Sequence, residues 1–151
     1  MNINEVIANR ANEILTGHKG YDCVHPNNHV NMGQSNNDVI PSAVKMACSL
    51  HLLELQSAMG EFKAILRRKI REFKDVVIVA RTCLQDAVPI TMGQEFSGYL
   101  SFIRRQMQEV KKAADTCLDI PLGAMAVGTG LGIFTGYKEA ISGLLTPRKL
   151  K

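Results

Sequence analysis

The stretch VKMACSLHLLELQSAMGEFKAILRRKIREF, residues 44–73, decides the fold. Its apolar residues recur every three or four positions, so they share one face of a single continuous helix. They are Val44, Cys48, Leu52, Leu55, Met59, Phe62, Leu66, Ile70 and Phe73. A helix of roughly 35 residues spans about 50 Å at about 1.5 Å per residue, which is too long for one small compact domain.

The beginning of this helix is indicated by two residues upstream. We expect Asp38 to be the N-cap, because its carboxylate can accept hydrogen bonds from free N–H groups of the first turn. Pro41 would then fall in the first turn, where a missing N–H is tolerated.

A second long helix is predicted from Met92 to Cys117 by the same apolar spacing. Thr91 and Gln94 can form a capping box at its start. Pro89 and Pro121 lie outside its two ends, as expected for a bounded helix.

The remaining segments are shorter. We predict a helix from Asn4 to about Leu15, an extended crossing segment over DVVIVARTCLQDAVP (75–89), and a glycine-rich loop over PLGAMAVGTGLG (121–132). A short amphipathic helix is expected over 137–145, followed by a basic tail, TPRKLK (146–151).

Composition excludes several classes of function. The 151 residues are enough for one domain, and a net charge of +4 with no Trp gives no aromatic and basic stripe for nucleic acid. No apolar run of about 18 residues and no signal peptide is present, so we expect no membrane contact and a cytoplasmic protein. No GxGxxG motif is found, and His25 with His29 lacks a third ligand, so no cofactor and no metal is expected.

The helix inventory is unbalanced. Two long helices each carry one apolar stripe, yet the chain offers no comparable helices to cover them. The missing partners must come from other chains or from absent parts of the protein.

The stretch VHPNNHVNMGQSNNDVIPSA, residues 24–43, is crowded with uncharged hydrogen-bonding side chains. Pro26 and the asparagines favour a loop here. Taken alone, the stretch is typical of a polar linker or of a binding surface for a small polar anion.

Four blocks in this order carry a resemblance to a known family. They are NINEVIANRA (2–11), VHPNNHVNMGQSNNDVIPSA (24–43), ARTCLQDAVPITMGQEFSGY (80–99) and PLGAMAVGTGLG (121–132). Together they resemble the fumarase/aspartase family of four-carbon dicarboxylate lyases, from residue 2 to about residue 140.

The resemblance implies an all-α fold, a long-helix bundle that forms part of the central helical domain of the L-aspartase-like fold. Residues 1–38 would end the N-terminal domain and hold a polar active-site loop, and 39–145 would form an incomplete helical-bundle domain. It also implies a homotetramer whose active sites gather residues from three subunits, with aspartate, fumarate or malate as the dicarboxylate partner.

The resemblance implies substrate-binding roles for Ser35, Asn36 and Asn37, which match the family's S-[ST]-N stretch, and for the adjacent Gln34. Asn36 departs from the usual Ser or Thr but can still donate a hydrogen bond. Neutral donors of this kind stabilise the aci-carboxylate dianion that forms when a proton beside a carboxylate is removed.

Two catalytic positions follow from the same comparison. Thr82 matches a substrate-contacting Thr, and Cys83 lies where fumarases carry His and aspartases commonly carry Gln. Because the histidine tied to water activation is absent, the resemblance favours aspartate ammonia-lyase over fumarate hydratase. The LQDAVPITMGQEF and PLGAMAVGTG blocks point the same way, whereas FSGY (96–99) looks more like fumarase.

His25, Asn27 and Asn28 match the secondary dicarboxylate site of fumarases, H-P-N-D, with Asn28 in place of Asp. The family's substrate loop would precede Met1, and its catalytic-base loop, G-S-S-x-M-P-x-K-x-N, would follow Lys151. We therefore expect an internal fragment that lacks turnover on its own. The alternatives are a class II fumarate hydratase and a non-catalytic truncated helical module that self-associates.

Overall fold

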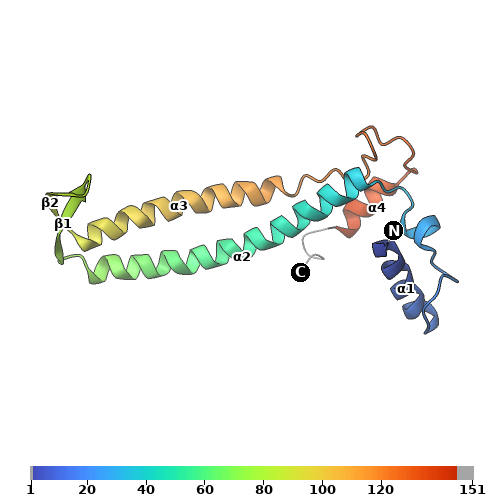
Figure 1. Cartoon of the computed structure of the whole chain (residues 1–151), viewed down its shortest axis with the longest axis horizontal. Helices are drawn as coiled ribbons and strands as arrows, with labels where there is room; N and C mark the ends of the chain where they lie inside the picture. Colours follow the sequence, from blue (N-terminus) through green and yellow to red (C-terminus); the bar gives the residue numbers. More distant parts are fainter. Residues whose placement is uncertain (1, 146–151) are drawn as a thin grey trace. The chain divides into compact units, whose positions relative to one another are not determined.

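The computed structural model describes residues 2–145 of the chain, so the basic tail predicted at 146–151 lies outside the described residues. The first helix is α1 (Asn2–Thr16). The two long helices are α2 (Asn36–Glu72) and α3 (Met92–Thr116), and the hairpin between them consists of β1 (Val77–Thr82) and β2 (Gln85–Thr91). A π-helical turn, η1 (Pro26–Val30), and a short helix, α4 (Tyr137–Leu144), complete the chain (Figure 1). The predominantly helical class expected from the sequence is confirmed.

Contacts divide the chain into two compact units, Met1–Val44 with Ile120–Lys151, and Lys45–Asp119. In the first unit, Asn12 is fully buried and joins α1 to the segment that follows it. Its side-chain N–H donates to the carbonyls of Ala8 and Val24, both at 2.8 Å, and its oxygen accepts from the Cys23 N–H at 2.8 Å. A fully satisfied buried amide of this kind fixes the entry into η1.

In the second unit, α3 runs back along α2 (Figure 1). The helices approach closely where the buried Gly93 donates its N–H to the Phe73 carbonyl at 3.0 Å, and the rings of Phe73 and Phe96 lie 5.7 Å apart. The capping box predicted at Thr91 and Gln94 is present at the start of α3.

The apolar stripe of α2 stays largely uncovered in the described chain. Val44, Leu55 and Phe62 are 56%, 46% and 47% exposed, while Leu66 is buried. The shortage of packing partners expected from the sequence is therefore a property of the described structure as well.

The structure corrects the predicted start of α2. Ser35, not Asp38, is the N-cap: its Oγ accepts from the Asn37 N–H at 3.3 Å and its carbonyl accepts from the Val39 N–H at 2.9 Å. Asp38 lies inside the first turn and its carboxylate accepts from the Ser35 N–H at 2.9 Å, which makes the cap reciprocal. Because α2 begins at Asn36, Pro41 lies within the helix beyond the first turn and offers no N–H to the Asn37 carbonyl.

Two further predictions differ from the structure. The segment 75–89 is extended, as expected, but it does not cross the molecule, because β1 and β2 form an antiparallel hairpin with Thr82 opposite Gln85. The segment after His25 was expected to be a loop, yet residues 26–30 form one π-helical turn. The His25 side chain caps that turn, which explains why the asparagine-rich sequence becomes helical there.

Candidate functional site

The N-terminus of α2 borders a cavity of about 570 Å³ within the first unit. Five of its eight lining residues carry carboxamides: Asn2, Asn4, Asn31, Gln34 and Asn36. The other three are aliphatic: Ile3, Val39 and Ile40. Among residues 2–145, no charged side chain lines this cavity, so the described lining offers neutral hydrogen-bonding groups beside the N-terminus of a 37-residue helix.

The predicted substrate-binding residues take different positions around this cavity. Gln34 and Asn36 line it, whereas Ser35 caps the helix. The Asn37 side chain instead donates to the Ala126 carbonyl at 2.8 Å, so part of its hydrogen-bonding capacity holds the glycine-rich loop.

Asn2, Asn4 and Asn31 also line the cavity and were not predicted to do so. The Asn4 amide donates to the Asn31 side-chain oxygen at 3.0 Å, which joins α1 to the turn before α2. Asn2 and Asn4 belong to the NINEVIANRA block, which is one of the four blocks that resemble the lyase family. The resemblance could therefore have indicated these two residues, whereas residue patterns alone did not.

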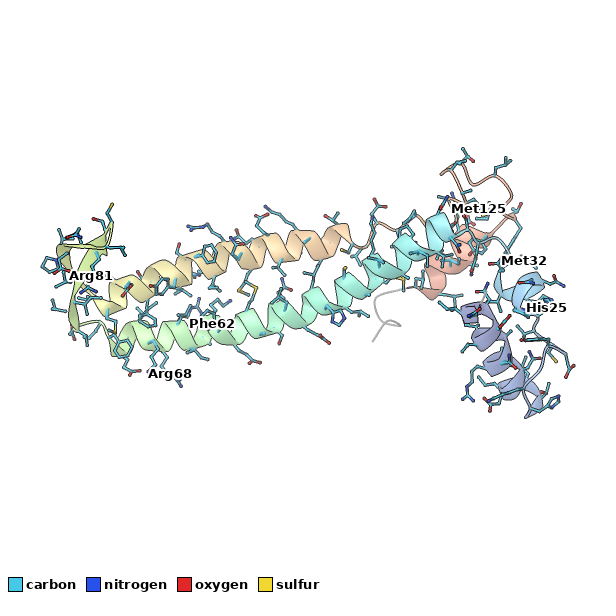
Figure 2. All side chains as sticks on the ribbon, viewed as in Figure 1. His25, Met32, Phe62, Arg68, Arg81 and Met125 are labelled. Atoms are coloured by element: carbon cyan, nitrogen blue, oxygen red, sulfur yellow. The ribbon has the colours of Figure 1, made fainter. Side chains whose placement is uncertain are left out.

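The predicted secondary site is ordered by backbone contacts. His25 Nδ1 accepts from the N–H groups of Asn27 and Asn28 at 3.2 and 3.3 Å, and the His25 N–H donates to His29 Nδ1 at 2.9 Å (His25 is labelled in Figure 2). Asn27 and Asn28 are exposed, and none of the three predicted residues lines the carboxamide cavity. Within residues 2–145, no group of three or more His, Cys, Asp or Glu side chains is arranged to hold a metal ion.

Thr82 and Cys83 lie in the second unit, at the end of the hairpin. Cys83 and Leu84 form its two-residue turn with φ of 49° and 62°, which corresponds to a turn that needs positive φ at both central positions. Side chains other than Gly, Asn and Asp rarely adopt this backbone conformation, which costs roughly 1–2 kcal/mol per residue. Cys83 is exposed, and Arg81 beside it pairs with Asp86 at 2.9 Å.

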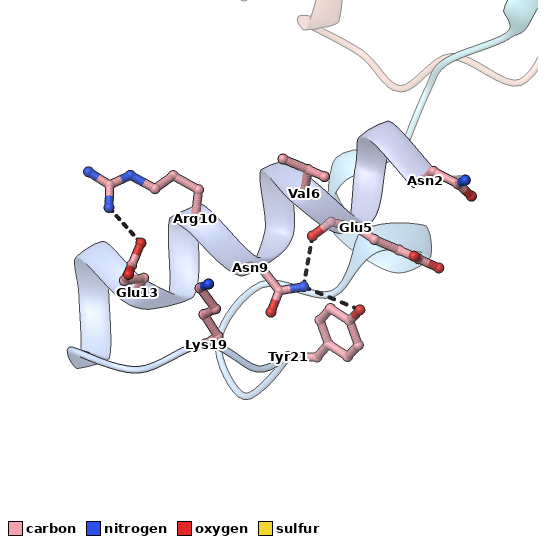
Figure 3. A pocket seen from close by; sticks show the side chains of 8 residues that line it. All are labelled: Asn2, Glu5, Val6, Asn9, Arg10, Glu13, Lys19 and Tyr21. Carbon is pink, nitrogen blue, oxygen red and sulfur yellow. Dashed lines mark hydrogen bonds and ion pairs between the residues drawn. The ribbon is translucent and has the colours of Figure 1, made fainter.

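A second hollow of about 640 Å³ lies between α1 and the residues after it (Figure 3). Its charged residues are Glu5, Arg10, Glu13 and Lys19, with Asn9 donating to the Tyr21 hydroxyl at 3.3 Å. Arg10 donates to Glu13 at 2.5 Å, and this hydrogen bond lowers the pKa of the Glu13 carboxyl. The two acids and two bases balance, so this hollow has no preference for anions, and it shares only Asn2 with the lining described for the carboxamide cavity.

None of the helices in the described part of the chain has the length and apolar character needed to cross a membrane.

Comparison with known proteins gives a consistent answer. A family model described as "Lyase" matches residues 1–149. A class II fumarate hydratase of Bradyrhizobium diazoefficiens is 47% identical over 133 residues, covering 87% of this chain and 28% of the relative. The aspartate ammonia-lyase of Bacillus subtilis is 45% identical over 143 residues, covering 93% of this chain and 30% of the relative.

Solved structures agree with these relatives. The structure of a fumarate lyase:delta crystallin from Brucella melitensis bound to cobalt is similar to this chain with a TM-score of 0.84 at 42% identity, covering 95% of this chain and 33% of that chain. A class II fumarase from Schistosoma mansoni gives a TM-score of 0.83 at 36% identity, covering 91% of this chain and 29% of that chain. The chain thus spans about a third of the length of the proteins it matches, and it belongs to the fumarase/aspartase superfamily of lyases.

Proposed function

We propose that this chain is part of an ammonia-lyase that converts L-aspartate reversibly to fumarate and ammonium. The observation that carries the proposal is the uncharged cavity lined by carboxamides at the start of α2. Its polar groups suit a small carboxylate-bearing anion, because amide N–H groups donate to carboxylate oxygens without needing counter-charges.

The chemistry explains why neutral donors are useful here. A base removes one proton from C3 of aspartate, and the electron pair moves into the adjacent carboxylate to give an aci-carboxylate dianion. Collapse of that dianion forms the C2–C3 double bond and expels the amine, which leaves as ammonium after taking up a proton. Donors fixed around the carboxylate stabilise the extra charge at the moment it develops, and Gln34 and Asn36 are our candidates for this role.

Cys83 is the residue that directs the choice of leaving group in this proposal. By resemblance it replaces the histidine tied to water activation in fumarases. A thiol at this exposed turn does not reproduce the two nitrogens of an imidazole, one of which accepts a proton while the other donates. Elimination of ammonia needs no activated water and is therefore favoured.

Fumarate hydration is the second candidate, because fumarate hydratases are named more often than ammonia-lyases among the relatives. Identity does not separate the two activities, since the values of 47% and 45% are nearly equal.

We also propose that the chain works as a homo-oligomer, with a tetramer as the expected state. Exposed apolar side chains on every long helix support this proposal, for example Leu53 at 52% and Phe102 at 53%. Its four free cysteines support the cytoplasm as its compartment.

A pair of chimeras tests the proposed reaction. In one, this chain replaces the matching 143 residues of the B. subtilis aspartate ammonia-lyase; in the other, it replaces the matching 133 residues of the B. diazoefficiens fumarate hydratase. We expect the first chimera to release fumarate from aspartate, followed by its ultraviolet absorbance, and the second to lose hydration of fumarate to malate.

Cys83→His is the matched variant in both chimeras. It should restore hydration in the second chimera and leave the first no more active than before. Full hydration by the second chimera with Cys83 in place would contradict the ammonia-lyase assignment and favour the hydratase.

A further inference from the structure

Asp38 is a fully buried acidic residue that the proposed reaction does not use. One oxygen of its carboxylate accepts from the Ser35 N–H at 2.9 Å, and the other accepts from the N–H groups of Gly123 and Met125 at 3.2 and 2.9 Å. A buried carboxylate is tolerated only where its oxygens are paired in this way. Its two oxygens therefore join the first turn of α2 to the glycine-rich loop (121–132).

The contact of Asp38 with Ser35 lies in the middle of the cavity lining. Ser35 stands directly between Gln34 and Asn36, and both of these side chains line the carboxamide cavity. Val39, which also lines the cavity, follows Asp38 directly. The Ser35 carbonyl in turn accepts from the Asp38 and Val39 N–H groups at 3.2 and 2.9 Å. Asp38 thus fixes the backbone that carries the two amides of the proposed substrate site.

The glycine-rich loop is the second anchor of this arrangement. Met125 has a φ of +62°, a backbone conformation that side chains other than Gly rarely adopt, and its N–H donates to Asp38. The neighbouring Asn37 side chain donates to the Ala126 carbonyl at 2.8 Å. Two adjacent side chains of α2 therefore hold the same stretch of the loop, and all of these residues belong to the first compact unit.

The charge of Asp38 does not explain its presence here. A negative charge in the first turn of α2 repels an anion in the cavity that borders this turn. Asparagine has nearly the same shape without the charge, but its amide offers one acceptor oxygen beside an NH₂ group. Only a carboxylate accepts hydrogen bonds on both sides, from Ser35 and from the loop. The geometry of these contacts, rather than electrostatic attraction, is what Asp38 supplies.

We infer that Asp38 is a positioning residue for the carboxamide cavity. It clamps the Ser35 backbone to the glycine-rich loop, and this clamp keeps the side-chain amides of Gln34 and Asn36 directed at the ligand's carboxylate. Donors that are fixed before the ligand arrives bind it more tightly than donors that must first be ordered. This inference rests on the proposed function, because it assumes that the cavity takes a carboxylate.

The test uses Asp38→Asn in the whole chain, with succinate as an unreactive four-carbon dicarboxylate. Titration calorimetry is done at a temperature at which circular dichroism shows every variant to be folded. Asp38→Asn should weaken succinate binding by about tenfold, the loss expected when one hydrogen bond to a charged ligand is misaligned. Removal of a repelling charge alone would tighten binding, so the direction of the change separates positioning from electrostatics.

Gly93→Ala is the control for a general loss of stability. Its new Cβ would lie 2.9 Å from the Ile70 carbonyl oxygen, so it destabilises the contact of α3 with α2 in the second unit. This variant should bind succinate as the wild type does. Nuclear magnetic resonance of the ligand-free chain gives a second readout, since Asp38→Asn should shift the NH₂ signals of Gln34 and Asn36, whereas Gly93→Ala should leave them unchanged.

A pair of glycine variants tests the clamp from the side of the loop, and it decides the matter if Asp38→Asn does not fold. Gly123 and Gly128 have similar φ values of +84° and +86°. A Cβ on Gly123 would come within 3.1 Å of the Ile133 and Lys138 side chains, whereas in the described chain a Cβ on Gly128 meets nothing within 4 Å. Gly123→Ala should therefore displace the N–H that donates to Asp38 and weaken succinate binding, and Gly128→Ala should not.

The outcomes separate this inference from the proposed function. If the wild type binds succinate and Asp38→Asn binds it equally well or more tightly, the inference fails while the proposed function stands. An equal loss of affinity in Gly93→Ala, or equal affinities of Gly123→Ala and Gly128→Ala, would also overturn it. If the wild type does not bind succinate, the proposed function falls and this inference with it.

Discussion

The carboxylate of Asp38 accepts a hydrogen bond from the backbone N–H of Met125 at 2.9 Å, although the two residues are 87 positions apart. The same oxygen accepts from the Gly123 N–H at 3.2 Å, and the other oxygen accepts from the Ser35 N–H. Asp38 is 0% exposed, so three backbone donors satisfy a fully buried carboxylate. The glycine-rich loop is thereby tied to the helix end that borders the carboxamide cavity.

We predict that Asp38→Asn lowers the free energy of unfolding by about 2–3 kcal/mol, because an amide NH₂ would face a backbone N–H where the carboxylate accepted it. Urea denaturation at one fixed protein concentration measures the change. Asp115→Asn is the control, because Asp115 is exposed in its ion pair with Lys111. This substitution should change the free energy of unfolding by less than about 1 kcal/mol. Equal stability of Asp38→Asn and the wild type would show that the buried carboxylate does not hold the loop.

Two glycines of α3 should respond in opposite directions to the same substitution. A Cβ on Gly93 would lie 2.9 Å from the Ile70 carbonyl oxygen and 3.1 Å from the Phe73 carbonyl oxygen. Gly93→Ala should therefore lower the free energy of unfolding by about 1–3 kcal/mol. Gly98 has nothing within 4 Å, so Gly98→Ala should stabilise by about 0.5–1 kcal/mol through helix propensity. Thermal unfolding of both variants checks the pair, and a stable Gly93→Ala would contradict the close approach of α2 and α3 at this end.

Alkaline pH should destabilise the chain partly through Tyr137. Burial raises its pKa above the ordinary value of 10.0, so above that pH the unfolded chain loses the phenolic proton before the folded chain does. The folded state then binds more protons, and stability falls as pH rises from about 10 toward the folded pKa. Tyr137→Phe should lose less stability than the wild type over this range, whereas an identical pH profile for the two would contradict a raised pKa.

Uncovered apolar faces predict self-association. Ile65 and Phe62 of α2 are 46% and 47% exposed, which leaves a stripe that water solvates poorly. Light scattering of the purified chain should give an oligomer, and Phe62→Glu should shift it toward smaller species. A monodisperse monomer in light scattering would contradict the prediction.

Helices were the most predictable part of the fold because apolar spacing is a local signal. The α2 and α3 patterns and the Thr91 cap needed no knowledge of distant residues. The hairpin was not predicted because its two turn residues are Cys83 and Leu84. A turn with positive φ at both positions is normally predicted from an Asn-Gly or Asp-Gly pair, which is missing here. Likewise, Ser35 and Asp38 are both good caps by residue type, and contacts from the distant residues 123 and 125 decide their roles.

Of the residues that line the candidate site, only those within one continuous block of sequence were predicted. Gln34 and Asn36 lie in the asparagine-rich block and do line the cavity. Asn2 and Asn4 come from α1, about thirty residues upstream, so no local pattern could join them to that block. Such neighbours are set by tertiary packing rather than by spacing in the sequence.

The central claim, that the carboxamide cavity binds a dicarboxylate, is tested most directly by nuclear magnetic resonance of the side-chain amide groups. Succinate is titrated into the chain labelled at Asn and Gln, and the shifts of each NH₂ group are followed. The account predicts saturable shifts at Gln34 and Asn36, with small ones at Gln56, an α2 residue that does not line the cavity. Unchanged Gln34 and Asn36 resonances at saturating succinate would contradict it.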